Sequence, residues 1–354
     1  MGWLEILGLI FLGVLLIAAY FGFKFYRWIK RSADQFNEMA IVQMVLPPIN
    51  FEIHSAPEAN WTQQARLLRD QQWLRDSGFT HEGDFDTIMG QAEALISLWG
   101  HADLAICCAI YECRVYLEDQ DDFHTVYASE LFQTYADGSS LAVSNSADAG
   151  TLPRPQKDRL VIEESESLGA LHQVLVQQAP NGVPVKALGN VVNAFQNFVE
   201  EYNAWLWEEA QLRDPTVAAL LEKVGVELSE DLLQRLLEEA RCEKSEWLSR
   251  KILRRLSERA NMTAANWEQI RERMVVVHQK MTADEIINSF YELLGEVCEK
   301  DEERIDAIAE LEHIACPVTL FSTRLTQLKA ANRIKLVAKM EVPVLSYVYM
   351  PKTI

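Results

Sequence analysis

The chain has 354 residues, and its 33 basic and 52 acidic side chains give a formal net charge of -19 at pH 7. Residues 51–180 alone hold 21 acidic and 7 basic side chains. A surface this acidic repels the phosphate backbone of DNA and RNA, which argues against a nucleic-acid partner. Solubility is the usual reason for such a surface, and a basic protein partner is the alternative interpretation.

Residues 1–31 predict a transmembrane anchor followed by a basic juxtamembrane segment. The apolar run from Ile6 to Phe23 has 18 residues and no charged side chain, and roughly 20 residues of helix cross a bilayer core of about 30 Å. The segment KFYRWIKR at residues 24–31 then supplies four cations. Because cations beside a helix end stay in the cytoplasm, the sequence predicts a single-pass inner-membrane protein whose C-terminal body faces the cytoplasm.

A cleaved signal peptide is the alternative to an anchor, and it would give a periplasmic body. Such a peptide carries cations before its apolar run and a cleavage site of small residues after it. Here the opening MGWLE has no basic residue, and LIAAYFG is a poor cleavage site. The order of charges therefore favours a retained anchor.

The rest of the chain predicts an α+β protein with several regions. We interpret residues 32–47 as a linker and residues 48–180 as an α+β domain in which helices cover one face of a small antiparallel β-meander. A mostly helical region follows over residues 181–332. Residues 333–354 form a C-terminal strand or tail.

The first helix of the α+β domain is predicted over residues 60–79. Gly78 suits its C-terminal end, where a left-handed backbone conformation is common. A turn at residues 100–103 then separates two predicted strands. The apolar stripe of the first helix consists of Trp61, Ala65, Leu68 and Trp73, and a helix after the meander carries Leu168, Leu171 and Leu175 on one face.

The segment ELFQTYADGSSLAVSNS at residues 130–146 is the strongest hairpin signal. Asp137-Gly138 predicts a two-residue type I′ turn. Pairing across that turn gives one apolar face, which favours a meander with a single covered side. The predicted face consists of Phe132, Thr134, Leu141 and Val143. The stretch TYADGSSLAVSNS resembles a segment of bacterial proteins without an assigned activity, and this resemblance implies no activity here.

The cysteines predict reduced, buried thiols in a reducing compartment. The chain has no C-x-x-C pair, so the usual signature of structural zinc is missing. On a strand over residues 103–113, Cys107 and Cys108 point to opposite faces. The six positions are Cys107, Cys108, Cys113, Cys242, Cys298 and Cys316.

Four polar residues in predicted loops remain as candidates for a base or a ligand. They are His81, His101, Asp103 and His124, and a solvated loop is the simpler interpretation of each. The motifs G-x-S-x-G, G-x-x-x-x-G-K-S/T, H-E-x-x-H and G-x-G-x-x-G do not occur. The sequence therefore assigns no catalytic, cofactor-binding or metal-ligating residue, and it leaves enzymatic activity open.

The helical region begins with heptad spacing from Leu188 to Trp205. Ordinary core packing and self-association through this face are the two interpretations. Asp214-Pro215 breaks the helix, and Ser229 is the expected N-cap of the next one. Further along the chain, Thr282 and Glu285 form a predicted capping box.

The C-terminal tail predicts one half-buried strand that ends near Pro343. It has no obvious strand partner nearby, so the meander or a second chain are the two candidates. The alternating apolar positions are Ile334, Leu336, Ala338, Met340 and Val342.

Two functional hypotheses follow from the sequence. The first is a membrane-anchored protein whose acidic cytoplasmic body is a protein-binding or scaffold module. The second is a membrane-anchored enzyme with a pocket between the meander and the helices, near His101, Asp103 or His124. A homo-oligomer formed through Leu188–Trp205 is a third arrangement.

Overall fold

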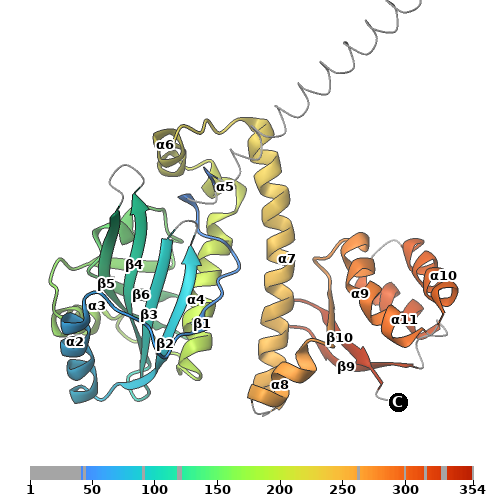
Figure 1. Cartoon of the computed structure of the whole chain (residues 1–354), viewed down its shortest axis with the longest axis horizontal. Helices are drawn as coiled ribbons and strands as arrows, with labels where there is room; N and C mark the ends of the chain where they lie inside the picture. Colours follow the sequence, from blue (N-terminus) through green and yellow to red (C-terminus); the bar gives the residue numbers. More distant parts are fainter. Residues whose placement is uncertain are drawn as a thin grey trace, which may run out of the picture. The chain divides into compact units, whose positions relative to one another are not determined.

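The computed structural model describes residues 41–42, 45–89, 92–117, 122–260, 264–298, 300–314, 317–327 and 333–352. The chain divides into two compact units, Met1–Ala240 and Arg241–Ile354, which are shown in Figure 1. The predicted anchor at residues 1–31 lies outside the described residues. Among the described helices, none is long and apolar enough to cross a bilayer.

The N-terminal unit contains a seven-stranded sheet in which the strands are neighbours in sequence order. All neighbouring strands are antiparallel except the last pair, which is parallel. The mixed α+β class is confirmed, and the sheet is larger than the small meander predicted. Its strands are β1 (His54–Ser55), β2 (Thr80–Met89), β3 (Ala92–His101), β4 (Ile106–Leu117), β5 (Asp122–Thr134), β6 (Ser140–Ser144) and β7 (Asp158–Ile162), with the 3₁₀ turn η1 (Ala147–Gly150) between β6 and β7.

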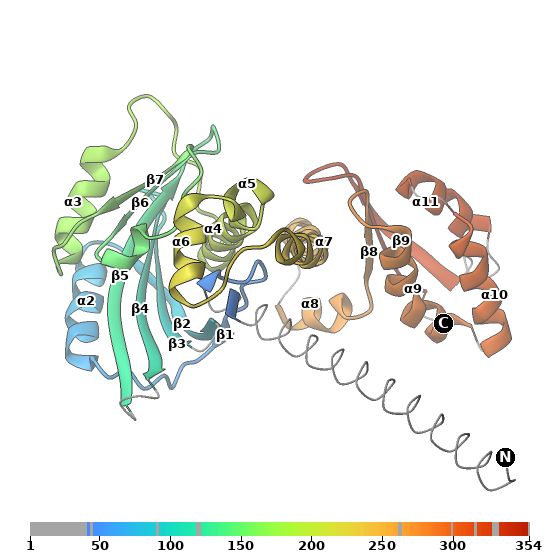
Figure 2. The ribbon, with the colours of Figure 1, turned by 90° about the horizontal axis from the view of Figure 1, so that it is seen from above.

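Helices cover both faces of this sheet, so the prediction of a single covered face is wrong. Helices α2 (Gln64–Asp76) and α3 (Leu168–Gln178) lie on one face, and α4 (Val191–Leu206) lies on the other (Figure 2). Both faces need cover because the central strands carry apolar residues at consecutive positions. Cys108 and Ile110 pack in the α2–α3 layer, whereas Cys107 and Ala109 pack in the α4 layer.

The β5–β6 hairpin has a different turn from the one predicted. Gly138 has a φ of +82°, but Asp137 does not have a positive φ. The Gly138 N–H donates to the Tyr135 carbonyl at 3.0 Å, and the Tyr135 N–H donates to the Ser139 carbonyl at 2.9 Å. This pattern is a type I turn followed by a left-handed glycine, which adds one residue to the loop.

The added residue shifts the pairing by one position, so the predicted faces of the hairpin are wrong. Phe132 pairs with Ala142 and Leu131 with Val143. Leu131 and Val143 therefore face the α2–α3 layer, and Phe132 faces α4. A shift of one residue reverses every side chain because strand side chains alternate.

Helix α2 ends where the sequence predicts, but it buries a different stripe. Gly78 has a φ of +87°, and the Phe79 N–H reaches back to the Leu74 carbonyl at 2.9 Å. Leu68, predicted to be buried, is 55% exposed. The buried residues of the helix are Leu67, Asp70, Gln71 and Leu74. The stripe of α3, by contrast, is the predicted one: Leu168, Leu171 and Leu175.

Predicted helix boundaries in the following region are confirmed. Asp214 caps α6 (Pro215–Lys223) by accepting from the Thr216 N–H, with Pro215 in the first turn. Ser229 Oγ accepts from the Leu232 N–H at the start of α7 (Glu230–Ala260) at 3.2 Å. The short helix α5 (Glu209–Leu212) precedes α6. The heptad face of α4 packs in the core of its own sheet through residues that include Leu188, Val191, Phe195 and Phe198.

The C-terminal unit has its own three-stranded antiparallel sheet, in the order β8-β10-β9. The stretch up to residue 332, which we expect to be mostly helical, also contains the strand β8. The expected single tail strand is instead a hairpin, in which Pro343 lies in the loop, where no ladder hydrogen bond is required of it. The elements are α8 (Ala264–Arg271), β8 (Val275–His278), α9 (Ala283–Val297), α10 (Asp301–Glu312), α11 (Val318–Gln327), β9 (Ile334–Met340) and β10 (Ser346–Pro351).

This second sheet is also covered on both faces. Val277 and Tyr347 belong to a core with Phe290 of α9, and residues of α10 and α11 complete it. Val276 and Val348 belong to a separate core with Ile252 of α7 and its neighbours. The sheet thus separates the α7 layer from the α9–α11 layer.

A buried carboxylate joins α2 to the larger sheet. Glu112 of β4 is 0% exposed, and its Oε2 accepts from the backbone N–H groups of Thr62 and Gln63 at 2.9 and 3.0 Å. Arg114 Nη2 donates to its Oε1 at 2.7 Å. Burial alone would raise the pKa of Glu112, but these hydrogen bonds outweigh it and hold the pKa below its usual value. The negative charge also suits the positive end of the α2 dipole.

We predict that Glu112→Gln destabilises the N-terminal unit by about 1–2 kcal/mol at pH 7, because the helix loses its buried anion. Since the pKa is lowered on folding, Glu112 contributes stability above its unfolded pKa and loses it as the pH falls through the folded pKa. The difference from wild type should therefore shrink on acidification in urea titrations. The exposed Glu93→Gln on β3 is the control; equal stability of E112Q and wild type at pH 7 contradicts the prediction.

Candidate functional site

A groove of about 670 Å³ in the C-terminal unit is the best candidate site. Three segments line it: the α7 stretch after residue 241, the residues from 272 into β8, and the first half of α9. Its polar lining includes Ser245, Ser249, Asn288 and Ser289, and its apolar lining includes Leu253, Met274, Met281 and Leu293. The volume is within the range of ligand-binding clefts in proteins.

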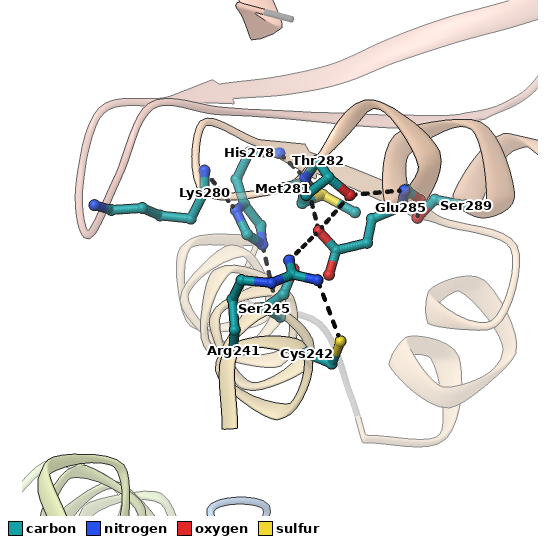
Figure 3. Close-up of polar contacts among 9 residues, drawn as sticks. All are labelled: Arg241, Cys242, Ser245, His278, Lys280, Met281, Thr282, Glu285 and Ser289. Atoms are coloured by element: carbon teal, nitrogen blue, oxygen red, sulfur yellow. Dashed lines mark hydrogen bonds and ion pairs between the residues drawn. The ribbon is translucent and has the colours of Figure 1, made fainter. Parts of the chain in front are cut away.

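An ion pair fixes the distance between two walls of this groove. Arg241 Nη1 of α7 donates to Glu285 Oε2 of α9 at 3.0 Å (Figure 3). Glu285 also accepts from the Thr282 N–H at 2.7 Å and completes the predicted capping box of α9. Burial alone would raise the pKa of Glu285, but the bonds from Thr282 and Arg241 lower it. Glu285 therefore stays ionised and serves as a structural anchor.

A buried histidine holds β8 against α7. His278 is 0% exposed, and its Nε2 lies 3.0 Å from the Ser245 carbonyl oxygen. The Lys280 N–H donates to its Nδ1 at 3.2 Å. Since Nδ1 accepts, the proton must sit on Nε2 and be donated to Ser245, which requires a neutral ring. Burial lowers the pKa of His278, and the bond to Ser245 and the charge of Glu285 oppose that shift.

These bonds limit the chemistry that the groove can perform. Cys242 is exposed at the groove, and Arg241 Nη2 donates to its Sγ at 3.4 Å. A thiol can be activated by a base within hydrogen-bond reach or by a neighbouring cation. Both ring nitrogens of His278 are already used, and Glu285 is held ionised by three donors. Neither His278 nor Glu285 is therefore free to act as a base toward Cys242.

The polar residues singled out in the sequence do not converge on a site. His81 Nε2 lies 3.1 Å from Asp84 Oδ1 and 3.3 Å from Ser97 Oγ. A catalytic relay would use the two different ring nitrogens, and Ser97 is 0% exposed. The His101 ring packs edge-on against Phe79 with centroids 5.1 Å apart.

The other two candidates give no site either. Asp103 lies in the exposed turn between β3 and β4. The side chain of His124 is outside the described residues. Among the described residues, no group of three or more His, Cys, Asp or Glu side chains could hold a metal ion.

Three of the five described thiols are buried as predicted. Cys107 and Cys108 lie in opposite layers of the sheet, as expected from strand alternation, and burial raises the pKa of both. Cys298 is also buried, whereas Cys113 is half-buried. The prediction is wrong for Cys242, which is exposed. Cys316 lies outside the described residues.

Glu130 is a second candidate that the sequence did not reveal. It is 9% exposed on the α4 side of β5, and burial raises its pKa while the nearby Arg154 opposes that rise. Arg154 lies over the Tyr202 ring at 4.9 Å and lines a pocket of about 620 Å³. A perturbed acid beside a pocket is typical of functional sites. Glu130 itself is not among the residues that line this pocket.

No protein-family model, curated protein or solved structure matches the chain. The residues of this chain are therefore the sole basis for assigning a function.

We predict that acid loosens the contact between β8 and α7. Because the pKa of His278 is lowered on folding, its neutral form contributes stability above the unfolded value of 6.5, and this contribution is lost as the pH falls through the folded pKa. Amide exchange in residues 275–280, corrected for its intrinsic pH dependence, should therefore accelerate below pH 6.5. His278→Gln should remove this acceleration, and the exposed His313→Gln should keep it. An unchanged pH response in H278Q contradicts the prediction.

Proposed function

We propose that the chain is a single-pass inner-membrane protein whose acidic cytoplasmic body is a protein-binding module. The groove between α7, β8 and α9 is its binding site. The observation that carries this proposal is the groove itself, which presents hydroxyl, amide, charged and apolar groups. Its acid Glu285 and the buried His278 beside it are committed to structural bonds. Methionines such as Met274 and Met281 suit such a surface because their side chains adapt to a partner's shape.

The charge of the body supports a protein partner with basic segments. A net charge of -19 attracts such segments and speeds their encounter with the groove. It also repels anionic lipid headgroups, which leaves residues 24–31 as the adhesive segment beside the membrane. In this proposal the anchor concentrates the body at the inner membrane, where its partner is met.

One observation favours the alternative, a membrane-anchored enzyme. Glu130 is buried with a raised pKa beside Arg154, which lines the pocket of the N-terminal unit. A reacting group must nevertheless reach its substrate directly or through one water. Because Glu130 is not part of the pocket lining, the binding module is the better-supported function.

The anchor gives the third prediction. A reporter active only in the cytoplasm, fused after Ile354, should be active, and one active only in the periplasm should not. Replacing the four cations of residues 24–31 with Ser should weaken or reverse this orientation. The control replaces four exposed cations remote from the anchor and should leave the orientation unchanged; these are Lys157, Lys186, Lys223 and Arg259. Activity of the periplasmic reporter, or a mature chain lacking residues 1–23, contradicts the anchored cytoplasmic body.

The groove gives the fourth prediction. A photo-crosslinking amino acid at Asn288 should join the full chain to a partner protein in intact cells, because Asn288 lines the groove. The same amino acid at Glu302, an exposed position of α10 outside the groove lining, should not. Crosslinks that form equally from both positions, or from neither, contradict a binding site in the groove.

A further inference from the structure

We infer that an extended peptide segment of a partner protein binds this groove as an added strand beside β8. The inference rests on the proposed function and specifies the partner's conformation and chemistry. In strand addition, the backbone of the peptide pairs with an open sheet edge, and its alternate side chains enter pockets on either side.

The groove lies at the edge of the sheet, beyond β8. Helices α7 and α9 belong to cores on opposite faces of the sheet, yet both line the groove. Two layers separated by a sheet can share a groove only past the last strand. The lining residues support this position at the edge of the sheet. They include Val275 and Val276, whose side chains point to opposite faces of the sheet.

The pairing of β8 with β10 shows which backbone groups face the groove. The Gln279 N–H donates to the Leu345 carbonyl at 3.0 Å, and Val277 stands opposite Tyr347. In an antiparallel pair, hydrogen-bonded and non-bonded positions alternate. The N–H and C=O groups of Val276 and His278 must therefore point away from β10, toward the open edge.

The structure already closes one end of this edge. The His278 N–H donates to Met281 Sδ at 3.4 Å, and the His278 carbonyl accepts from the Met281 N–H at 3.0 Å. Among the described residues, no hydrogen bond of this kind involves the outward groups of Val276. An added strand would supply a donor and an acceptor to them.

The other edge of the sheet is protected against such pairing. β9 carries the exposed cations Lys335 and Lys339, and lysines on an edge strand discourage the approach of another strand. β8, with the sequence VVVH, has no such charge. The two edges therefore differ in the way expected if only β8 receives a partner.

The lining of the groove carries charges of both signs. Glu246 and Glu272 line the groove and are exposed, and Arg250 and Arg273 line it as well. The apolar walls, which include Leu253 and Leu293, suit alternating apolar residues. We therefore assign the site to an extended segment with alternating apolar residues.

The test uses the full chain in detergent and a displayed library of random peptides of about 12 residues. Selection should enrich sequences with alternating apolar residues. A synthetic peptide of the most enriched sequence should then slow exchange of the Val276 amide by about tenfold or more, with little change at the Val275 and Val277 amides, which already pair with β10. In an added strand, the N–H groups of every second residue point toward β8. N-methylation of those residues should abolish binding, whereas N-methylation of the intervening residues should not.

Variants of the groove walls provide the controls. Ser249→Trp and Asn288→Trp, on opposite walls, should each abolish peptide binding, whereas Glu302→Trp on α10 should not. Slow exchange of the Val275 and Val277 amides, which pair with β10, shows that a variant remains folded. Only a variant that remains folded is used to judge whether the substitution abolishes peptide binding.

Three outcomes overturn the inference. The first is a library that yields no enriched peptide, and the second is a bound peptide that leaves the Val276 amide unprotected. The third is protection that rises with protein concentration without peptide, which makes a second copy the occupant. If Asn288 crosslinks to a partner but the Val276 amide stays unprotected, the groove is a binding site and the partner does not bind as an added strand.

Discussion

The sheet of the C-terminal unit is three strands wide, and this constraint places the groove at its edge. The sheet keeps α7 and the α9–α11 layer apart along its length, with separate cores on its two faces. The layers approach a common space only past β8, where the ion pair of Arg241 and Glu285 spans them at 3.0 Å. The groove is thus a product of a narrow sheet between two helical layers.

In both units, buried polar groups join a helix to a strand. His278 binds a helix carbonyl and a turn amide, and Glu112 binds the two backbone amides just before α2. A buried polar group is costly unless all its hydrogen-bonding capacity is met, so each of these groups permits one arrangement of helix and strand. Apolar packing alone would tolerate sliding between the same elements.

Short-range signals could be predicted from the sequence, and long-range pairing could not. The capping residues Ser229 and Thr282 and the helix end at Gly78 depend on neighbours within a few positions. The hairpin register depended on one extra turn residue at Gly138, which Asp-Gly does not specify.

The candidate site was missed for the same reason. Its walls come from residues far apart in the chain, and the partner of His278, Ser245, is 33 positions away. A lone histidine in a strand gives no sign of such a contact. A sheet covered on both faces also weakens the alternating pattern from which strand faces are predicted.

The position of Glu112 has a consequence for how β4 finds its neighbours during folding. Because apolar residues occupy both faces of this strand, a slip of one residue would keep its hydrophobic burial nearly constant. The slip would, however, turn the carboxylate toward the α4 layer, where Tyr111 now lies 6.3 Å from Phe195. A buried anion without a helix terminus to receive it is strongly disfavoured. Glu112 thus selects the register of β4, because the apolar residues of this strand would be buried equally well in either register.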